Sequence, residues 1–430
     1  MSETERKVPA SSWWGLALLT LVYTLNFLDR TLIYILFPYL KKELHLSDLQ
    51  LSLLGATAFV IFYTLLGVPF GRLADRVSRK GLIAGGLFVW SLFSGLTAFA
   101  DSFTTIFLCR VMVGVGEATL GPAALSLLSD YFPPRSRATV SAIYSAGIPL
   151  GGGLAFFLGG MLGQELGWRW AFGLLGFPGV LVALLVLALK EPARGTTEGK
   201  IVAIATATAK AEIGFLEGVK RLYATPVLLW HHAGYALFAL AGNSLSIWGP
   251  LFFVRVHGLD IKTIGIFAGI LSVAGGIPGT ILGGFAADRF RRRGPGGRML
   301  FCAFGALLCI PLWGLLLFST SIPVLIAVNT LLLAAALLWL GPAAADVHEV
   351  AGPELRGLGV GLYFFTAMMA GYGIGPPIVG KLNDLLGVAT DPSGMRLALL
   401  VSPAACALAA FCLFMGSRAM TKRARALGIT

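Results

Sequence analysis

The sequence predicts an all-α integral membrane protein of about twelve transmembrane helices in two six-helix bundles, with both termini cytoplasmic. Three observations predict this fold. Hydrophobic residues make up 57% of the 430 residues and charged residues only 13%, whereas a soluble domain carries roughly 25% charged residues. Apolar stretches of about 20 residues recur along the chain. Short sequence motifs of the first half recur in the same order in the second half.

Each apolar stretch is long enough to cross a hydrocarbon core of roughly 30 Å as a helix. Lipid cannot satisfy backbone amides, and the stretches are too long and too uniformly apolar for barrel strands. The predicted spans cover residues 13–38, 50–72, 81–101, 103–128, 137–163, 168–189, 226–254, 263–287, 298–318, 321–344, 355–383 and 395–417.

The predicted organisation has three parts. An N-terminal bundle covers residues 1–190, a cytoplasmic linker covers 191–225 and a C-terminal bundle covers 226–430. The linker is polar, and residues 209–223 fit an amphipathic surface helix. The first span is too long for a signal-peptide core, so we expect it to be retained.

Basic residues predict the orientation of the chain. They gather in the connections on one side of the predicted spans, in the linker and in the C-terminal tail, and the positive-inside rule places that side in the cytoplasm. The formal charge of +12 is therefore a signal of topology with some attraction to anionic lipid, and does not indicate nucleic-acid binding. The five cysteines lie in apolar stretches without metal-site spacing, so we expect no metal and no cofactor.

An internal repeat divides the chain. The stretch from Gly71 to Lys80 contains Asp75-Arg76 and follows the second span, and a similar stretch from Gly284 to Arg293 follows the eighth. Proline and arginine recur before the fifth and eleventh spans, and a Gly/Pro-rich run recurs inside them. Duplicated halves are a recurring plan of secondary transporters, which hold substrate at the interface between the repeats.

The stretch over residues 71–80 closely resembles the loop signature G-x-L-x-D-R-x-x-R-K of the major facilitator superfamily, and the resemblance covers essentially the whole chain. It implies the major facilitator fold. A turn with one acid and several bases can hold helix ends together in one state and release them in another. We expect this gating latch to involve Gly71, Asp75, Arg76, Arg79, Asp288 and Arg289; the alternative is that the basic residues only anchor the topology.

Ionisable residues near span centres are costly and usually functional. The first span contains Asp29 and Arg30, and the fourth contains Arg110 and Glu117, which are seven residues apart and share one helical face. We expect Asp29 and Glu117 to carry protons, with Arg110 as their coupler or as an anion anchor, because a nearby guanidinium favours an ionised carboxylate. The alternative is a static ion network. The direction of the Arg30 side chain is left open.

The second half offers polar and aromatic side chains in place of central charges. Together with Arg110 and Arg30, we expect Asn243, Trp248, Tyr363 and Tyr372 to contact substrate, although such side chains often serve packing. His231 and His232 are interpreted as interfacial. A cavity charged on one wall and apolar on the other suits an amphipathic anion.

Within the superfamily, the N-terminal half resembles the spinster-like carriers. The resemblance rests on Leu25–Arg30, on Arg110–Ala118 with its Val-Gly-Val-Gly-Glu-Ala ending, and on the later Ile148-Pro149-Leu150-Gly151. It implies a proton-coupled secondary transporter that moves an amphipathic, lipid-like solute, either a lysophospholipid or a sphingoid, with Asp29, Arg110 and Glu117 as matching functional positions. The C-terminal half resembles the family less distinctively.

Two alternatives remain open. A sugar-acid type of organic-anion/proton symporter has the same fold and a similar charged pattern, and a non-transporting receptor or scramblase-like protein belongs to another class. An enzyme is not expected, and a channel lacks a filter-like segment. The expected partners are a small amphipathic or anionic solute, protons and membrane lipids, but no nucleic acid. We expect a monomer in the cell membrane, the inner membrane if the source is bacterial.

Overall fold

The computed structural model of the protein describes residues 8–133, 136–194 and 214–428. In this part of the chain all regular secondary structure is helical, and twelve helical segments are long and apolar enough to cross a membrane. The prediction of an all-α protein with about twelve spans is confirmed. The part of the predicted linker over residues 195–213 lies outside the described residues.

Several spans of the N-terminal half are built from more than one helix, and a short irregular turn often joins the pieces. The elements of this half are α1 (Ala10–Leu44), α2 (Asp48–Ser52), η1 (Leu53–Thr57), α3 (Ala58–Ala74), α4 (Arg79–Leu96), η2 (Thr97–Phe99), α5 (Phe103–Glu117), α6 (Leu120–Tyr131), α7 (Arg137–Ser145), α8 (Gly147–Glu165), α9 (Trp168–Gly176) and α10 (Pro178–Leu187).

The C-terminal half begins with a short helix that precedes its first span. Its elements are α12 (Phe215–Tyr223), α13 (Pro226–His257), α14 (Ile261–Arg291), α15 (Gly297–Phe318), α16 (Ile322–Leu337), α17 (Leu340–Val350), α18 (Gly352–Met368), η4 (Met369–Ile374), α19 (Gly375–Leu385), α20 (Gly394–Ala398) and α21 (Val401–Ala426).

Proline places matching breaks in the two halves. The pentapeptide Leu-Gly-Pro-Ala-Ala starts both α6 at Leu120 and α17 at Leu340. Its proline cannot donate a hydrogen bond to the carbonyl four residues earlier, so the fourth span breaks before Leu120 and the tenth breaks before Leu340. The shared break supports the duplication that the sequence predicts.

Two spans contain a π-helical turn where the halves meet. The turn η1 lies in the second span and η4 lies in the eleventh, and the two are in contact. Pro376 and Pro377 follow one residue after η4, so the carbonyls of Tyr372 and Gly373 cannot receive the regular helical hydrogen bond. Such turns are frequent at functional sites because they redirect side chains and free backbone carbonyls.

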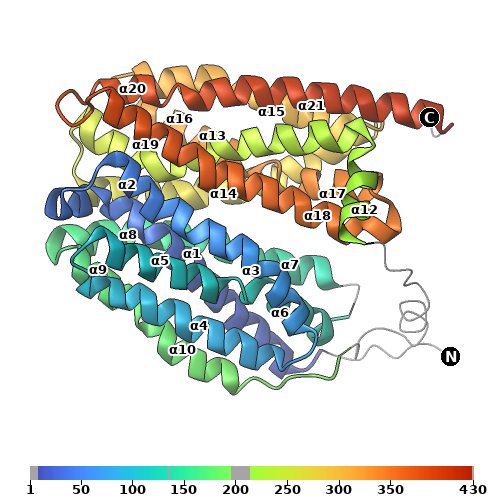
Figure 1. The fold of residues 1–430 in the computed structure, drawn as a ribbon, viewed down its shortest axis with the longest axis horizontal. Helices are drawn as coiled ribbons and strands as arrows, with labels where there is room; N and C mark the ends of the chain where they lie inside the picture. Colours follow the sequence, from blue (N-terminus) through green and yellow to red (C-terminus); the bar gives the residue numbers. More distant parts are fainter. Residues whose placement is uncertain (1–7, 134–135, 195–213, 429–430) are drawn as a thin grey trace.

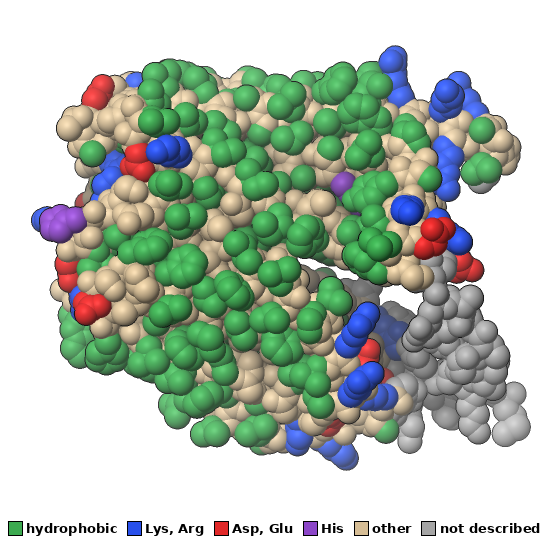
Figure 2. Space-filling view, viewed as in Figure 1, with side chains coloured by type: hydrophobic (Ala, Val, Ile, Leu, Met, Phe, Trp, Pro, Cys, Tyr) green, Lys and Arg blue, Asp and Glu red, His purple; other side chains and the backbone are tan. Residues whose placement is uncertain are grey.

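The two bundles lie side by side, the N-terminal bundle in blue to green and the C-terminal bundle in yellow-green to red (Figure 1). They pack tightly through α8 against α14 and through α2 against α19. α1 starts at the end of the molecule where α21 finishes (Figure 1). Figure 2 shows the halves hollowed apart at this end, where Lys and Arg side chains gather, whereas they meet at the other.

Candidate functional site: a buried charge network between the bundles

The centre of the candidate site is an ion pair between α1 and α5. Nη2 of Arg30 lies 2.6 Å from Oε2 of Glu117, and Nε of Arg30 donates to the same oxygen at 3.1 Å. Nη2 also lies 3.4 Å from the side-chain oxygen of Asn26. The other carboxylate oxygen of Glu117 is buried and makes no hydrogen bond within the described chain. The direction of Arg30 is thereby settled: it faces Glu117 on the neighbouring helix.

Arg110 occupies a different environment from the one that its spacing suggests. Its guanidinium donates to the carbonyls of Asp29 at 3.2 Å, Arg30 at 3.3 Å and Leu54 at 3.3 Å. Leu54 belongs to the π-helical turn η1, where backbone carbonyls lack regular helical partners. In this conformation Arg110 therefore joins α1, η1 and α5, and Arg30 is the direct partner of Glu117.

Asp29 is held by a hydroxyl and not by a guanidinium. Ser94 on α4 donates to Oδ1 of Asp29 at 2.7 Å, and the carboxyl group is almost completely buried. Ser94 has no signal in the sequence that links it to the site, because a serine in an apolar span is common. Asp29, Arg30, Arg110 and Glu117 are all buried, and two acids face two bases, so the cluster is neutral when both carboxyl groups are ionised.

Aromatic rings enclose the guanidinium of Arg30. Its central carbon lies 4.4 Å from the ring centre of Phe59, 4.7 Å from that of Phe27 and 4.9 Å from that of Tyr63. Ring faces stabilise a cation in a site from which water is excluded. These rings were not among the predicted site residues, because phenylalanine and tyrosine in a span are indistinguishable by sequence from packing residues.

The C-terminal residues that we expected to contact substrate lie in different parts of the structure. Tyr372 in η4 packs against the hydrophobic cores of both halves and lies in electrostatic range of Arg30 and Glu117. Trp248 is fully buried, packs at a tilt against the ring of Phe37 and donates to the carbonyl of Pro376 at 3.1 Å, so it belongs to the tightly packed end. The structure therefore brings Tyr372, and not Trp248, to the charge network.

Asn243 lies against Gly371 of η4, next to Tyr372, whereas Tyr363 lies in the core of the C-terminal bundle. The side-chain amide of Asn243 donates to the carbonyl of Ala239 on its own helix at 2.9 Å. Tyr363 is fully buried in the C-terminal bundle among His231, Tyr235 and Trp339. His231, interpreted from the sequence as interfacial, is 0% exposed, because α17, α18 and α21 pack against α13 around it.

In the N-terminal half, the predicted latch ties helix ends within one bundle. The buried guanidinium of Arg79 pairs with Asp130 on α6 and donates to Glu191 at 3.1 Å. Burial disfavours the charged form of Glu191, but hydrogen bonds from Ser78 and Arg79 outweigh burial and lower its pKa from the usual value. Asp75 is exposed and lies 3.9 Å from Arg194, which donates to carbonyls at the end of α3.

The matching latch of the second half has a different centre. Asp288 accepts a hydrogen bond from Arg298 at the start of α15 at 2.9 Å, and Arg298 also donates to Glu349 at 3.3 Å. Gly71 lies inside α3, whereas Arg76 and Arg289 are exposed. All the ion pairs given for these latch residues connect parts of the same bundle. The sequence did not single out Arg298.

Ion pairs between the bundles lie at the tightly packed end. Arg255 at the end of α13 forms two hydrogen bonds to Asp48, one of them 2.9 Å long, and Lys41 pairs with the same carboxylate. The carboxylate of Asp384 accepts the backbone amides of Asp48 and Leu49 at 2.8 and 2.9 Å. This lock was not predicted, because Asp48, Arg255 and Asp384 lie at span ends far apart in the sequence.

Glycine allows the closest approach of the bundles at this end. A methyl group on Gly160 of α8 would lie 2.9 Å from the Cα of Gly265 on α14.

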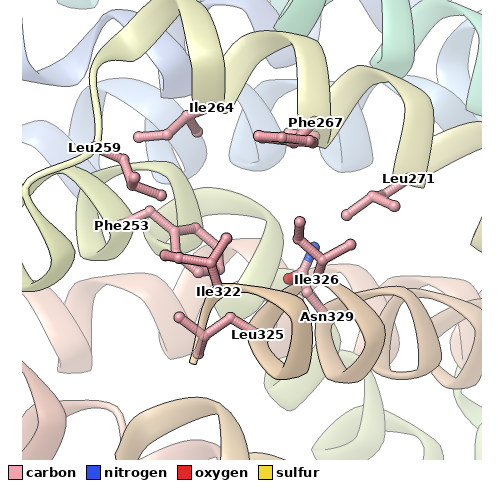
Figure 3. Close-up of a pocket in the computed structure, with 10 residues that line it drawn as sticks. Phe253, Leu259, Ile264, Phe267, Leu271, Ile322, Leu325, Ile326 and Asn329 are labelled. Atoms are coloured by element: carbon pink, nitrogen blue, oxygen red, sulfur yellow. The ribbon is translucent and has the colours of Figure 1, made fainter. Parts of the chain in front are cut away.

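Nearby, an apolar pocket opens between α13, α14 and α16, with Phe253, Phe267 and Ile322 on its wall and Asn329 as its polar member (Figure 3). The pocket includes none of the predicted substrate contacts.

Two six-helix bundles, a buried charge network in the N-terminal bundle that faces η4 of the other, and a hollow at one end are typical of a transmembrane solute carrier. The chain matches the sequence profile of the Major Facilitator Superfamily over residues 19–376. It belongs to this superfamily and is a spinster-like, multi-pass membrane transporter.

Known proteins of this class resemble the chain over nearly its full length. An MFS-type efflux pump of Mycolicibacterium smegmatis is 30% identical over 96% of this chain and 94% of its own. A hexuronate transporter of Bacillus subtilis is 27% identical over 86% of this chain and 87% of its own. The crystal structure of a bacterial homologue of the human lysosomal transporter Spinster, inward-facing and unoccupied, is 27% identical and superposes with a TM-score of 0.83, covering 98% of this chain and 99% of that one.

Proposed function

We propose that the chain is a proton-coupled secondary transporter that moves an amphipathic, lipid-like solute by alternating access. The observation that carries the proposal is the buried Arg30–Glu117 pair, in which one carboxylate oxygen of Glu117 has no hydrogen-bond partner in the described chain. The pair lies beside Tyr372 of the other bundle, so movement of the bundles changes its surroundings.

Charge balance gives the coupling step. With both acids ionised, the charges of Asp29, Arg30, Arg110 and Glu117 sum to zero. A proton that binds Glu117 neutralises it and leaves Arg30 without its partner, so the site carries one positive charge that an anionic group of the substrate can balance. One proton moving through 100 mV supplies about 2.3 kcal/mol.

The wall opposite Arg30 favours an amphipathic solute. Phe27, Phe59 and Tyr63 surround the guanidinium, and Met369 and Tyr372 approach from the second bundle. Such a surface offers one cationic group within an aromatic and thioether lining, which suits an anionic headgroup attached to an apolar chain. The resemblance to spinster-like carriers supports the same class of solute.

Alternating access follows from the two ends of the molecule. With the termini in the cytoplasm, as the basic residues predict, the described conformation opens inward and the Asp48–Arg255 lock closes the outer side. We infer that the bundles rock about the central site, that the outer lock opens when the inner ends close, and that the Asp75 and Asp288 latches hold the inner helix ends.

A sugar-acid/proton symporter is the second candidate, favoured by the likeness to a hexuronate transporter. That function requires polar groups on the C-terminal wall, where Asn243 is bonded to its own helix. A non-transporting receptor or a scramblase-like protein, the candidates of another class, would not accumulate a solute against its gradient.

Transport by the purified full chain in liposomes that enclose a pH-sensitive dye tests the proposal. Lysophospholipid, sphingoid phosphate and hexuronate are supplied in parallel. Glu117→Gln and Asp29→Asn are compared with Glu217→Gln and Asp101→Asn, which remove exposed carboxylates. We expect lysolipid or sphingoid uptake with a pH change, lost in the first two variants and kept in the controls. Hexuronate uptake would favour the second candidate, and binding without accumulation would favour a receptor.

A further inference from the structure

The C-terminal bundle contains a second cluster of buried polar groups, apart from the charge network of the N-terminal bundle. It lies where α13 and α15 begin and α17 ends. Seven of its buried side-chain atoms make no hydrogen bond within the described residues: Nδ1 of His231, Nε2 of His232, the hydroxyls of Tyr235 and Tyr363, Nε1 of Trp339 and both carboxylate oxygens of Asp346. A buried polar atom without a partner is costly, so we expect water molecules and bound protons to satisfy these atoms.

The tautomer of His231 follows from one hydrogen bond. Its Nε2 lies 2.9 Å from the carbonyl oxygen of Ala343 on α17. A carbonyl can only accept, so Nε2 carries the hydrogen and Nδ1 of the neutral ring is a bare acceptor. The ring packs 4.6 Å from that of Tyr235, and Nδ1 is buried without a partner. His231 therefore presents an open site for a proton inside the bundle.

Asp346 lies one helical turn after Ala343 on α17 and is within electrostatic range of the Tyr235 hydroxyl and the Cys302 thiol. Its nearest cation is Arg298, whose Nη1 lies 3.6 Å from Oδ1, too far for a hydrogen bond. Arg298 instead donates to Asp288 and Glu349. The carboxyl group thus has a cation beside it that is engaged elsewhere.

The local charges do not balance. Arg291 and Arg298 face the three carboxylates of Asp288, Asp346 and Glu349. The side chain of Asp346 is 1% exposed, whereas those of Asp288 and Glu349 are 66% and 32% exposed. An excess negative charge is most costly on the buried member. The titratable and charged groups around it are His231, His232 and Tyr235 of α13, Asp288 and Arg291 of α14, Arg298 and Cys302 of α15, Glu349 of α17, Tyr363 of α18 and Tyr223 of α12, which contacts His232.

We propose that Asp346 and His231 form a second protonation site, with the proton on Asp346 while Arg298 is bound by Asp288 and Glu349. When Arg298 turns to Asp346, the O–H bond of Asp346 breaks and the proton passes through bound water to Nδ1 of His231, which gives a carboxylate and an imidazolium. The site therefore links the Asp288 latch to proton binding. Only this link to gating rests on the proposed function.

Infrared difference spectroscopy of the full chain in lipid nanodiscs tests the site without measuring transport. The Asp29→Asn/Glu117→Gln background removes the N-terminal buried acids, and spectra are compared between about pH 5 and pH 9. We expect a pH-dependent C=O band of a protonated carboxyl group that Asp346→Asn abolishes and Glu354→Gln, at an exposed acid, leaves intact. His231→Gln should keep the band and shift its pH midpoint.

Absence of such a band from Asp346 would show that this carboxyl group does not change protonation in the range and would overturn the proposal. A band whose midpoint is unmoved in His231→Gln would remove His231 from the site. If Asp346→Asn does not fold, Asp346→Glu keeps the acid and displaces it by one methylene; a shifted band supports the site, and an unshifted band contradicts it. Because transport is not the readout, this result is independent of whether Asp29 and Glu117 couple protons to a solute.

Discussion

Nη2 of Arg30 lies 2.6 Å from Oε2 of Glu117, and their side chains are 3% and 0% exposed. A buried ion pair contributes little net stability, but removal of one partner leaves an unbalanced charge and costs about 3–5 kcal/mol. Any step that neutralises Glu117 therefore makes Arg30 available to another anion.

A double-mutant cycle at this pair should show strong coupling. We expect Glu117→Gln and Arg30→Gln each to destabilise the protein, and the double variant to lose less than the sum by about 0.5–3 kcal/mol, because it leaves no unpaired charge. Unfolding of the purified protein in detergent measures the three changes. Additive losses would mean that the two side chains do not depend on each other.

We expect Arg110 to hold α1, η1 and α5 together in the described conformation. Arg110→Lys keeps the charge, but one ammonium cannot reach the carbonyls of Asp29, Arg30 and Leu54 together. Each buried carbonyl left without a donor costs about 1–3 kcal/mol, so the unfolding temperature should fall clearly below that of the wild type. Arg110→Lys with unchanged stability but weakened substrate binding would instead identify an anion anchor.

The spans and the buried charges could be predicted from the sequence, whereas the partners of those charges could not. Apolar length identifies a span directly, and Asp29, Arg30, Arg110 and Glu117 stand out because charges in lipid are rare. The pairing of Arg30 with Glu117 depends on how α1 rotates against α5. The contacts of Arg110 depend on the π-helical turn η1, which no residue pattern predicts.

The site predictions for the C-terminal half were less specific, because residue type alone does not show where a side chain packs. Trp248, Tyr363 and Tyr372 have the same residue character in the sequence, yet they lie at the closed end, in the bundle core and at the charge network, respectively. His231 and Asp346 fall near predicted span ends, where charge is ordinary, and only tertiary packing shows that both are buried.

Loss of the Asp48–Arg255 lock should shift the conformational equilibrium. Asp48→Asn removes the charge that binds Arg255 and Lys41, and a buried charged hydrogen bond contributes about 1–3 kcal/mol, or about 5- to 150-fold in population. Spin labels at Lys42 and Ala389, on the exposed surface of the closed end, should move apart, while labels at Val77 and Arg292 should approach. Distance distributions identical to those of the wild type would contradict a role of Asp48 in closure.

Glu191 gives a prediction about pH. Because its pKa is lowered in the folded protein, its stabilising contribution is present above the ordinary carboxyl pKa of about 4.3 and disappears only as the pH falls through the lower folded value. The Arg79–Glu191 contact therefore stays intact across the range in which transport is measured. We expect Glu191→Gln to lower the unfolding temperature near neutral pH while leaving the midpoint of the pH profile of transport in place. Liposome assays at stepped pH, with Glu217→Gln as the exposed control, check this, and a displaced midpoint would make Glu191 a pH-sensing part of the gate.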